Sequence, residues 1–215
     1  MKIVPIILAS SNEEFSAQAN KIGSLSNHIN IDVCDGIVAP SPTLSLEEIL
    51  TKINNNPLLV SKKIDFDLMV KDWLPLVELL NHNKDLNINS VVVHQKYLQK
   101  NPTSEFDFGV ALDLADKVVY KTLSKFPLIQ IMTVELGKQG GTFHPEALLK
   151  VTELRQNGYE GQIVIDGGVS DLTLPLILEN KGLPDIVGVG SYLTRSFNSV
   201  ENYQKLQSIV TNYSY

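Results

Sequence analysis

Eight short runs of apolar and β-branched residues recur along the chain, and patterns typical of helices lie between them. The runs are mostly continuous, which indicates parallel strands covered on both faces. Strands that alternate with helices predict a parallel sheet with right-handed crossovers. We expect the strands at residues 3–9, 29–34, 64–69, 88–94, 108–112, 128–134, 163–166 and 186–189.

The length of the chain favours closing this sheet into a barrel. Its 215 residues allow about 27 residues for each strand–helix unit, close to the minimum for a (β/α)₈ TIM barrel. The G-x-G-x-x-G fingerprint of an open dinucleotide-binding sheet does not follow the first strand. We therefore expect residues 1–215 to form one α/β domain, a single (β/α)₈ barrel. The interval 95–105 contains Pro102 and lacks a helical face, so the fourth helix is expected to be reduced or lost.

Charge and hydropathy exclude several classes of partner. Eighteen basic and 24 acidic residues give a net charge of −6 without a basic stripe, which argues against nucleic acid. The longest apolar runs, about seven residues, fall far below the roughly 20 that span a membrane. The first run contains Pro5 and one positive charge, and we interpret it as a buried strand instead of a signal sequence. The single cysteine, Cys34, suits a reducing cytoplasm, where we expect the protein.

Polar side chains occupy the predicted carboxyl ends of three strands, the ends that face the active site in such barrels. Because side chains alternate along a strand, Asn30, Asp32 and Cys34 share the face opposite two apolar residues. The same alternation turns Asp67 inward on the next strand, and Asp166 ends the seventh strand. We expect three carboxyl groups and one amide to converge at the mouth of the barrel.

A single aspartate at a strand end most often caps a helix or accepts a hydrogen bond from a loop. Three aspartates close together need their negative charges to be balanced. Like charges in a half-buried site raise one another's pKa or demand a cation. No arginine follows these strands. The sequence therefore predicts either a metal ion or a protonated carboxyl group at this position. His94, at the end of the fourth strand, is interpreted as a structural histidine.

Glycines follow each of the last three strands. Backbone amides in this part of a barrel commonly bind phosphate. Taken singly, such glycines are only turns, but their clustering favours a phosphate site made by Gly140, Gly141, Gly167, Gly168, Gly190 and Ser191.

These segments, in this order, resemble the ribulose-phosphate 3-epimerase family, which consists of metal-dependent barrels of the ribulose-phosphate-binding type. The best matches are residues 32–36, 65–69, 132–134, 140–146, 165–168 and 190–191. The resemblance implies that Asp32 and Asp166 act as acid and base on opposite faces of carbon three of a ketopentose phosphate. It also implies a pocket lined by Met69 and Met132, with Cys34 replacing a third methionine, and it suggests a homo-oligomer.

The sequence departs from the family mainly at the metal. The family binds its metal through two histidines and two aspartates, and the histidine positions here hold Asn30 and Asp67. A ligand set of Asn30, Asp32, Asp67 and Asp166 would be all oxygen. Such a set disfavours Zn²⁺ and suits Mg²⁺, Mn²⁺ or Ca²⁺, if a metal is bound at all. Two serines near the first strand are replaced by Ile6 and Ala9.

Three functions follow from the resemblance and its departures. The first is a carbohydrate-phosphate epimerase, an isomerase of the pentose phosphate pathway that moves a proton at carbon three with help from a metal. The second is a phosphosugar-binding barrel that has lost catalysis, because the ligand positions and serines have changed. The third, a barrel that only binds a partner protein, fits the retained aspartates and glycines least. A small sugar phosphate is the expected partner.

Overall fold

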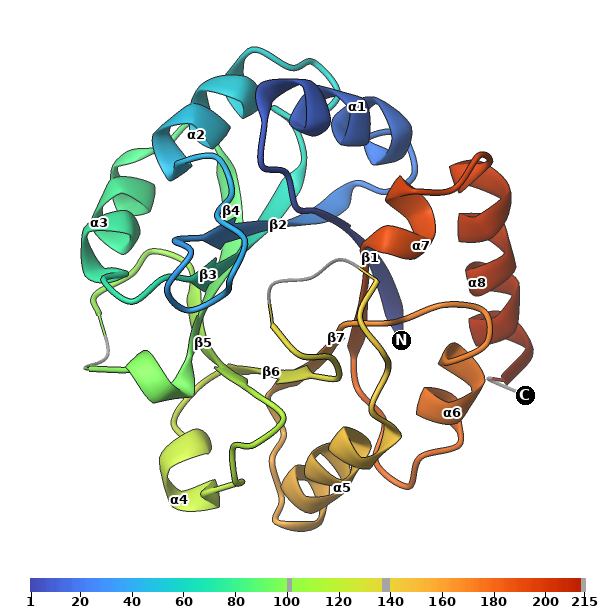
Figure 1. Cartoon of the computed structure of the whole chain (residues 1–215). Helices are drawn as coiled ribbons and strands as arrows, with labels where there is room; N and C mark the ends of the chain where they lie inside the picture. Colours follow the sequence, from blue (N-terminus) through green and yellow to red (C-terminus); the bar gives the residue numbers. More distant parts are fainter. Residues whose placement is uncertain (100–101, 137–139, 214–215) are drawn as a thin grey trace.

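Eight parallel strands close into a barrel in chain order, with β1 paired to β8. The computed structural model describes residues 1–99, 102–136 and 140–213. Figure 1 views the ring of strands along its axis, with the helices arranged around the outside. The predicted (β/α)₈ barrel is confirmed.

The strands are β1 Lys2–Ile7, β2 His28–Cys34, β3 Lys63–Met69, β4 Asn87–His94, β5 Asp107–Leu112, β6 Leu128–Met132, β7 Gln162–Asp166 and β8 Ile186–Val189. The α-helices are α1 Asn12–Ile22, α2 Leu46–Asn54, α3 Leu74–His82, α4 Tyr120–Leu123, α5 Leu148–Gln156, α6 Leu174–Leu178, α7 Ser191–Thr194 and α8 Ser199–Tyr213. Two 3₁₀ turns are η1 Gln95–Tyr97 and η2 Pro145–Ala147. In the described part of the chain, each helix is too short or too polar to cross a membrane.

All eight predicted strands are present, but the first and sixth end two residues earlier than expected. Just after β1, the Gln18 side chain on α1 forms hydrogen bonds with both the backbone amide and the backbone carbonyl of Leu8. Its Oε1 accepts from the Leu8 amide at 3.1 Å, and its Nε2 donates to the Leu8 carbonyl at 2.7 Å. After β6, the Thr133 carbonyl accepts from the His144 amide at 2.8 Å. Both segments therefore leave the hydrogen-bonded ladder of the barrel strands.

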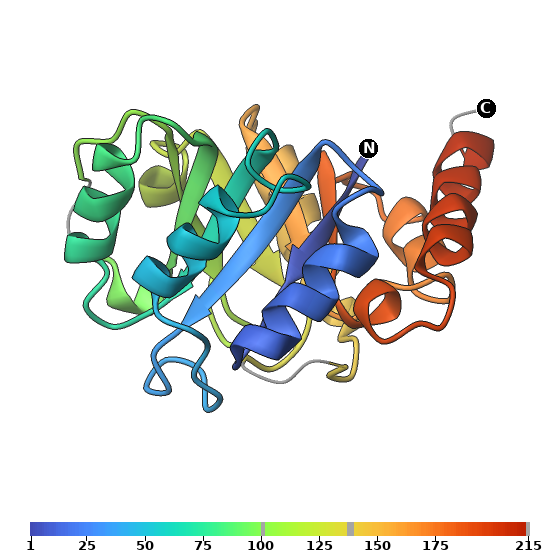
Figure 2. The same cartoon turned by 90° about the horizontal axis from the view of Figure 1, so that it is seen from above.

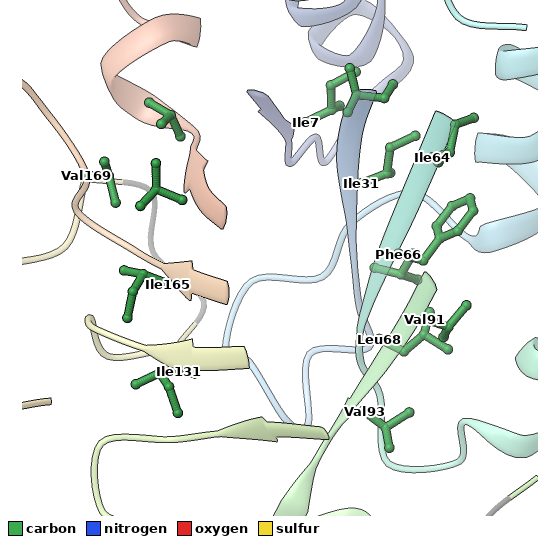
Figure 3. Packing of buried hydrophobic residues seen from close by; sticks show 14 of the residues in the cluster. Ile7, Ile31, Ile64, Phe66, Leu68, Val91, Val93, Ile131, Ile165 and Val169 are labelled. Carbon is green, nitrogen blue, oxygen red and sulfur yellow. The ribbon is translucent and has the colours of Figure 1, made fainter. Parts of the chain in front are cut away.

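The two faces of the strands differ in chemistry. Residues on the outer face form the main hydrophobic core between strands and helices, and Figure 3 shows several of them pointing away from the ring, such as Phe66, Val91 and Ile131. The inner face carries much of the buried polar set, namely Asn30, Asp32, Asp67, Ser90, His94, Gln130 and Asp166. Both faces are buried as expected, but the inner face mixes these polar groups with buried apolar residues such as Val4, Val92 and Leu128.

The fourth crossover is reduced, as the sequence predicts. Within residues 95–99 and 102–106, η1 is its one regular element. Trp73, just before α3, is fully buried and helps to cover the outside of the barrel here. Its ring lies 5.4 Å from that of Phe108 on β5, and its Nε1 donates to the Tyr97 carbonyl at 2.9 Å. A neighbouring unit therefore fills part of the space that a fourth helix would occupy.

Helix caps fix where several helices begin after the carboxyl ends of the strands. Ser45 and Glu48 form a complete capping box at α2. Ser11 caps α1 by accepting from the Glu14 amide at 3.2 Å, but the Glu14 side chain returns to Ser10. Asn198 accepts from the Glu201 amide at 3.1 Å. Figure 2 shows the blue loop after β2 projecting from the side toward which that strand runs.

Candidate active site

Three buried aspartates converge inside the barrel, near the carboxyl ends of the strands. Asp32, Asp67 and Asp166 each offer a carboxylate oxygen, and these atoms lie within 4.8 Å of one another. The strand register explains part of this convergence, because Asp32 on β2 pairs with Asp67 on β3. Asp166 ends β7 on the other side of the ring. The convergence expected from strand alternation is present.

The space for Asp166 depends on Gly188, the neighbouring residue on β8. A Cβ at this position would lie 2.6 Å from Ile6 Cδ1 and 3.3 Å from Asp166 Oδ1. No side chain fits there without a shift of the carboxylate or of Ile6. Gly188 therefore lets the seventh and eighth strands bring Asp166 close to the axis.

Burial and mutual repulsion act on the acidity of these groups. Burial raises the pKa of Asp32 well above its ordinary value, and the charges of Asp166 and Asp67 raise it further. Burial, followed by the charge of Asp67, raises the pKa of Asp166 to about 7. Asn30 opposes the rise at Asp32, because its Nδ2 donates to Asp32 Oδ1 at 2.7 Å. Asp166 can thus hold or release a proton near neutral pH, and Asp32 holds a proton more readily than an ordinary aspartate.

Asp67 lies deepest and is held by two neighbours. It is fully buried, and its Oδ2 accepts from Gln130 Nε2 at 2.7 Å. Its Oδ1 lies 3.2 Å from His94 Nε2, while His94 Nδ1 lies 2.6 Å from Asp113 Oδ1. Burial would lower the pKa of His94, but Asp67 and Asp113 raise it to about 10. Asp67 and Asp113 therefore favour the protonated form of the His94 ring, which would offset part of the negative charge of the cluster.

One cavity joins the carboxyl groups to the glycine cluster. Asp32 and Asp166 line it together with Met69 and Met132. The same cavity is lined by all six residues predicted to bind phosphate, Gly140, Gly141, Gly167, Gly168, Gly190 and Ser191. Ile6 also lines this cavity. The structure thus places the predicted acid–base and phosphate residues around one space.

Two of the glycines adopt backbone conformations that other residues rarely tolerate. Gly167 has φ 109° and Gly168 has φ 64°. A Cβ on Gly167 would also lie 2.4 Å from Val134 Cγ2. Thr133 fixes this turn from β6, because its amide donates to the Asp166 carbonyl at 2.7 Å. The chain therefore turns sharply after Asp166 and keeps its backbone exposed to the cavity.

Three predicted site residues lie beside the cavity instead of lining it. Asn30 and Asp67 sit in the layer next to Asp32. Cys34 packs behind the cavity wall, with its Sγ 3.8 Å from Met69 Sδ. Burial, with the charge of Asp32 next, raises the pKa of the Cys34 thiol, so the nucleophilic thiolate is disfavoured.

Sequence reasoning missed two residues of this region, Gln130 and Arg195. His94, interpreted as a structural histidine, is buried and lies between the carboxylates of Asp67 and Asp113. Alternation along β6 turns Gln130 inward, but its partner Asp67 is 63 residues away in the sequence. Arg195 follows α7, and its Nη1 lies 3.2 Å from the place of a Cβ on Gly140. The positively charged guanidinium group of Arg195 thus lies beside the glycine cluster.

The chain is similar in sequence to known epimerases. The model of the ribulose-phosphate 3 epimerase family matches residues 2–193. A ribulose-phosphate 3-epimerase of Schizosaccharomyces pombe is 26% identical over 183 residues, which cover 79% of this chain and 77% of that protein. One of Methanocaldococcus jannaschii is 23% identical over 158 residues, which cover 70% of this chain and 66% of that protein, just under two thirds of its length.

Solved structures share the fold at lower identity. The 3-hexulose-6-phosphate synthase of Salmonella typhimurium has a TM-score of 0.69 at 15% identity and covers 99% of this chain and 100% of its own. KGPDC from Streptococcus mutans in complex with D-R5P has a TM-score of 0.64 at 14% identity, with 98% and 97% covered. At these identities the likeness establishes the barrel alone.

Proposed function

Because the chain belongs to the ribulose-phosphate 3 epimerase family, we propose that it interconverts ketopentose phosphates by moving a proton at carbon three. The observation that carries this proposal is the single cavity lined by Asp32, Asp166 and the glycine cluster. Epimerisation needs one group to remove the proton and another to return a proton on the opposite face. Two buried carboxyl groups with raised pKa values, on opposite sides of the ring, suit these two tasks.

The glycine cluster supplies the other half of the proposed site. Gly167 and Gly168 line the cavity with positive φ angles and no side chain, so the backbone can approach an anionic phosphate closely, and Arg195 adds a positive charge beside Gly140. A phosphate held there leaves the sugar carbons to extend toward Asp32 and Asp166, which line the same cavity. Orientation of the substrate would then come from the end of the molecule that does not react.

A divalent ion fits the carboxylate cluster. Three carboxylate oxygens within 4.8 Å form an all-oxygen donor set, which suits Mg²⁺, Mn²⁺ or Ca²⁺ better than Zn²⁺. Asp32, Asp67 and Asp166 would hold it, with Asn30 adjacent. When bound, it would polarise the ketone and stabilise the negative charge that develops on oxygen.

Proton exchange in D₂O tests this function. Incubation with ribulose 5-phosphate and each divalent metal in turn is expected to remove the carbon-three proton signal from the NMR spectrum. Asp32→Asn and Asp166→Asn should each slow the exchange by about 10²–10⁴-fold, because each removes one proton-transfer group. Asp72→Asn, an exposed position outside the cavity, is the matched control and should exchange like the wild type.

The alternative, a phosphosugar-binding barrel without catalysis, is favoured by one observation. Ile6 places an apolar side chain in the cavity where the family has a serine. Loss of exchange under every metal, with thermal stabilisation by ribulose 5-phosphate retained, would select this binder. Absence of both exchange and stabilisation would exclude a sugar-phosphate function. The homo-oligomer also stays a proposal, to be tested by the mass in solution against 23.8 kDa for one chain.

A further inference from the structure

We propose that Lys21 is a positioning residue for Arg195, an ammonium on α1 that holds the backbone around Arg195 so that its guanidinium stays beside the glycine cluster. The proposal rests on the phosphate end of the proposed function and does not need the proton transfer. It links a side chain of the first helix to the rim of the cavity near the other end of the chain.

Lys21 binds the backbone on both sides of Arg195. Its Nζ donates to the Thr194 carbonyl and to the Ser196 carbonyl, each at 2.9 Å. The last carbonyls of a helix lack partners within the helix, and a lysine side chain commonly supplies one. One cation from another element therefore fixes the peptide groups that flank Arg195 in the α7 segment, residues 190–196.

The α7 segment is otherwise held by side chains of α8. Ser199 Oγ donates to the Leu193 carbonyl at 2.8 Å, and Asn202 Nδ2 donates to the Tyr192 carbonyl at 3.0 Å. Figure 1 shows α7 between α1 and α8, and it contacts both helices. Among the described residues, Lys21 is the α1 side chain that hydrogen-bonds to this segment. Without it, the side-chain hydrogen bonds from other helices would come from α8 alone.

The α7 segment also forms part of the cavity. Gly190 and Ser191 line the cavity, and the Arg195 amide donates to the Ser191 carbonyl at 3.0 Å. The Arg195 guanidinium reaches the loop after β6, where its Nη1 lies 3.2 Å from the place of a Cβ on Gly140. A shift of the α7 segment would therefore move Arg195 relative to the glycine cluster.

Arg195 has no acidic side chain to hold it in place. The other arginine of the chain, Arg155, is paired with Asp185 at 2.6 Å, whereas Arg195 is exposed and has no ion-pair partner in the described part of the chain. An exposed arginine loses rotamer entropy when it binds an anion, and a loose backbone would add to that loss. Lys21 reduces this loss because it fixes the carbonyls next to Arg195 before phosphate arrives.

The dissociation constant of inorganic phosphate, measured by isothermal titration calorimetry in EDTA, tests this role. Arg195→Ala should raise the constant by about 10-fold or more, and Lys21→Met by about 2- to 10-fold, the range of one hydrogen bond. Lys21→Arg keeps a charged donor and should recover most of the affinity. Lys125→Met, which removes the same charge from the exposed turn between α4 and β6, is the matched control and should change the constant by less than about 1.5-fold.

A double-mutant cycle separates positioning from charge. If Lys21 acts through Arg195, Lys21→Met should change the dissociation constant by less than about 1.5-fold in the Arg195→Ala background. An equal loss in both backgrounds would overturn the proposal, because Lys21 would then attract phosphate through its own charge. Lys21 is exposed, so Lys21→Met should fold. A lower melting temperature with unchanged phosphate affinity would also overturn the proposal, since Lys21 would then serve only the fold.

Failure of this proposal can be told apart from failure of the proposed function. Weaker binding by Arg195→Ala with unchanged binding by Lys21→Met would overturn the positioning role alone. Wild-type affinity in Arg195→Ala, or no phosphate binding by the wild type, would overturn it together with the phosphate end of the proposed function. The exchange of the carbon-three proton enters none of these measurements, so a loss of catalysis would leave the role of Lys21 measurable.

Discussion

At the scale of single residues, the carboxyl groups and His94 couple the stability of the barrel to pH. The folded-state pKa of Asp166 is raised from 3.8 to about 7. Its contribution to stability is fully present below pH 4 and is lost as pH rises toward 7, because the folded state binds the proton more tightly. The pKa of His94 is raised from 6.5 to about 10, so its contribution is lost between these values.

We therefore expect the melting temperature of the metal-free protein to fall steadily from pH 5 to pH 9. Thermal unfolding followed by circular dichroism in EDTA would measure this. Asp166→Asn should flatten the part below pH 7, and His94→Gln the part above it. A melting temperature that rises across this range would contradict the signs of both shifts.

Arg195 gives a second prediction at this scale. Its guanidinium stands beside Gly140 at the rim that we propose for phosphate. Arg195→Ala should raise the KM for ribulose 5-phosphate by about 10- to 100-fold, the range of a charge-assisted hydrogen bond, and leave kcat nearly unchanged. Arg195→Lys should recover part of the loss because it keeps the charge. A fall in kcat at unchanged KM would place Arg195 outside the binding of the phosphate.

At the scale of secondary-structure elements, the strands could be predicted because each carries a buried apolar outer face. Alternation along β2 also predicted that Asn30 and Asp32 point inward together. The end of β1 could not be predicted, because it depends on the Gln18 side chain from α1. The hydrogen-bond partners of His94 could not be predicted either, because Asp67 and Asp113 lie on or after other strands and reach it only in the closed barrel.

Trp73 gives the prediction at the element scale. It is the buried side chain that joins α3, η1 and β5 beside the reduced fourth crossover. Trp73→Ala should cost about 3–5 kcal/mol of the free energy of unfolding, as large core truncations do. Trp73→Phe should cost less, since it retains most of the packing and loses the bond to the Tyr97 carbonyl. Chemical denaturation followed by circular dichroism would measure both.

Phe197→Ala is the control for these variants, because Phe197 is fully exposed. It should stay within about 0.5 kcal/mol of the wild type. If Trp73→Ala changed the free energy of unfolding no more than this control, Trp73 would not be the side chain that covers the barrel at the reduced crossover.

At the scale of the whole molecule, the barrel has no free sheet edge among the described residues, because β1 pairs with β8 through four residues. We expect residues 1–215 to unfold in one cooperative transition. Circular dichroism, which reports the helices and strands, should give the same midpoint as the fluorescence of Trp73. Separate midpoints for the two probes would indicate that half of the ring opens first.

The short connection between β4 and β5 is also a place where a foreign sequence can be inserted into the chain. Five residue pairs already hold these two strands together, and Thr103, Ser104 and Glu105 lie by the far end of α3, away from the cavity. Lengthening such a link costs mainly loop entropy, about 0.6 kcal/mol for each doubling. A peptide or fluorescent reporter inserted here would be carried by the barrel without contact with the cavity of the proposed active site.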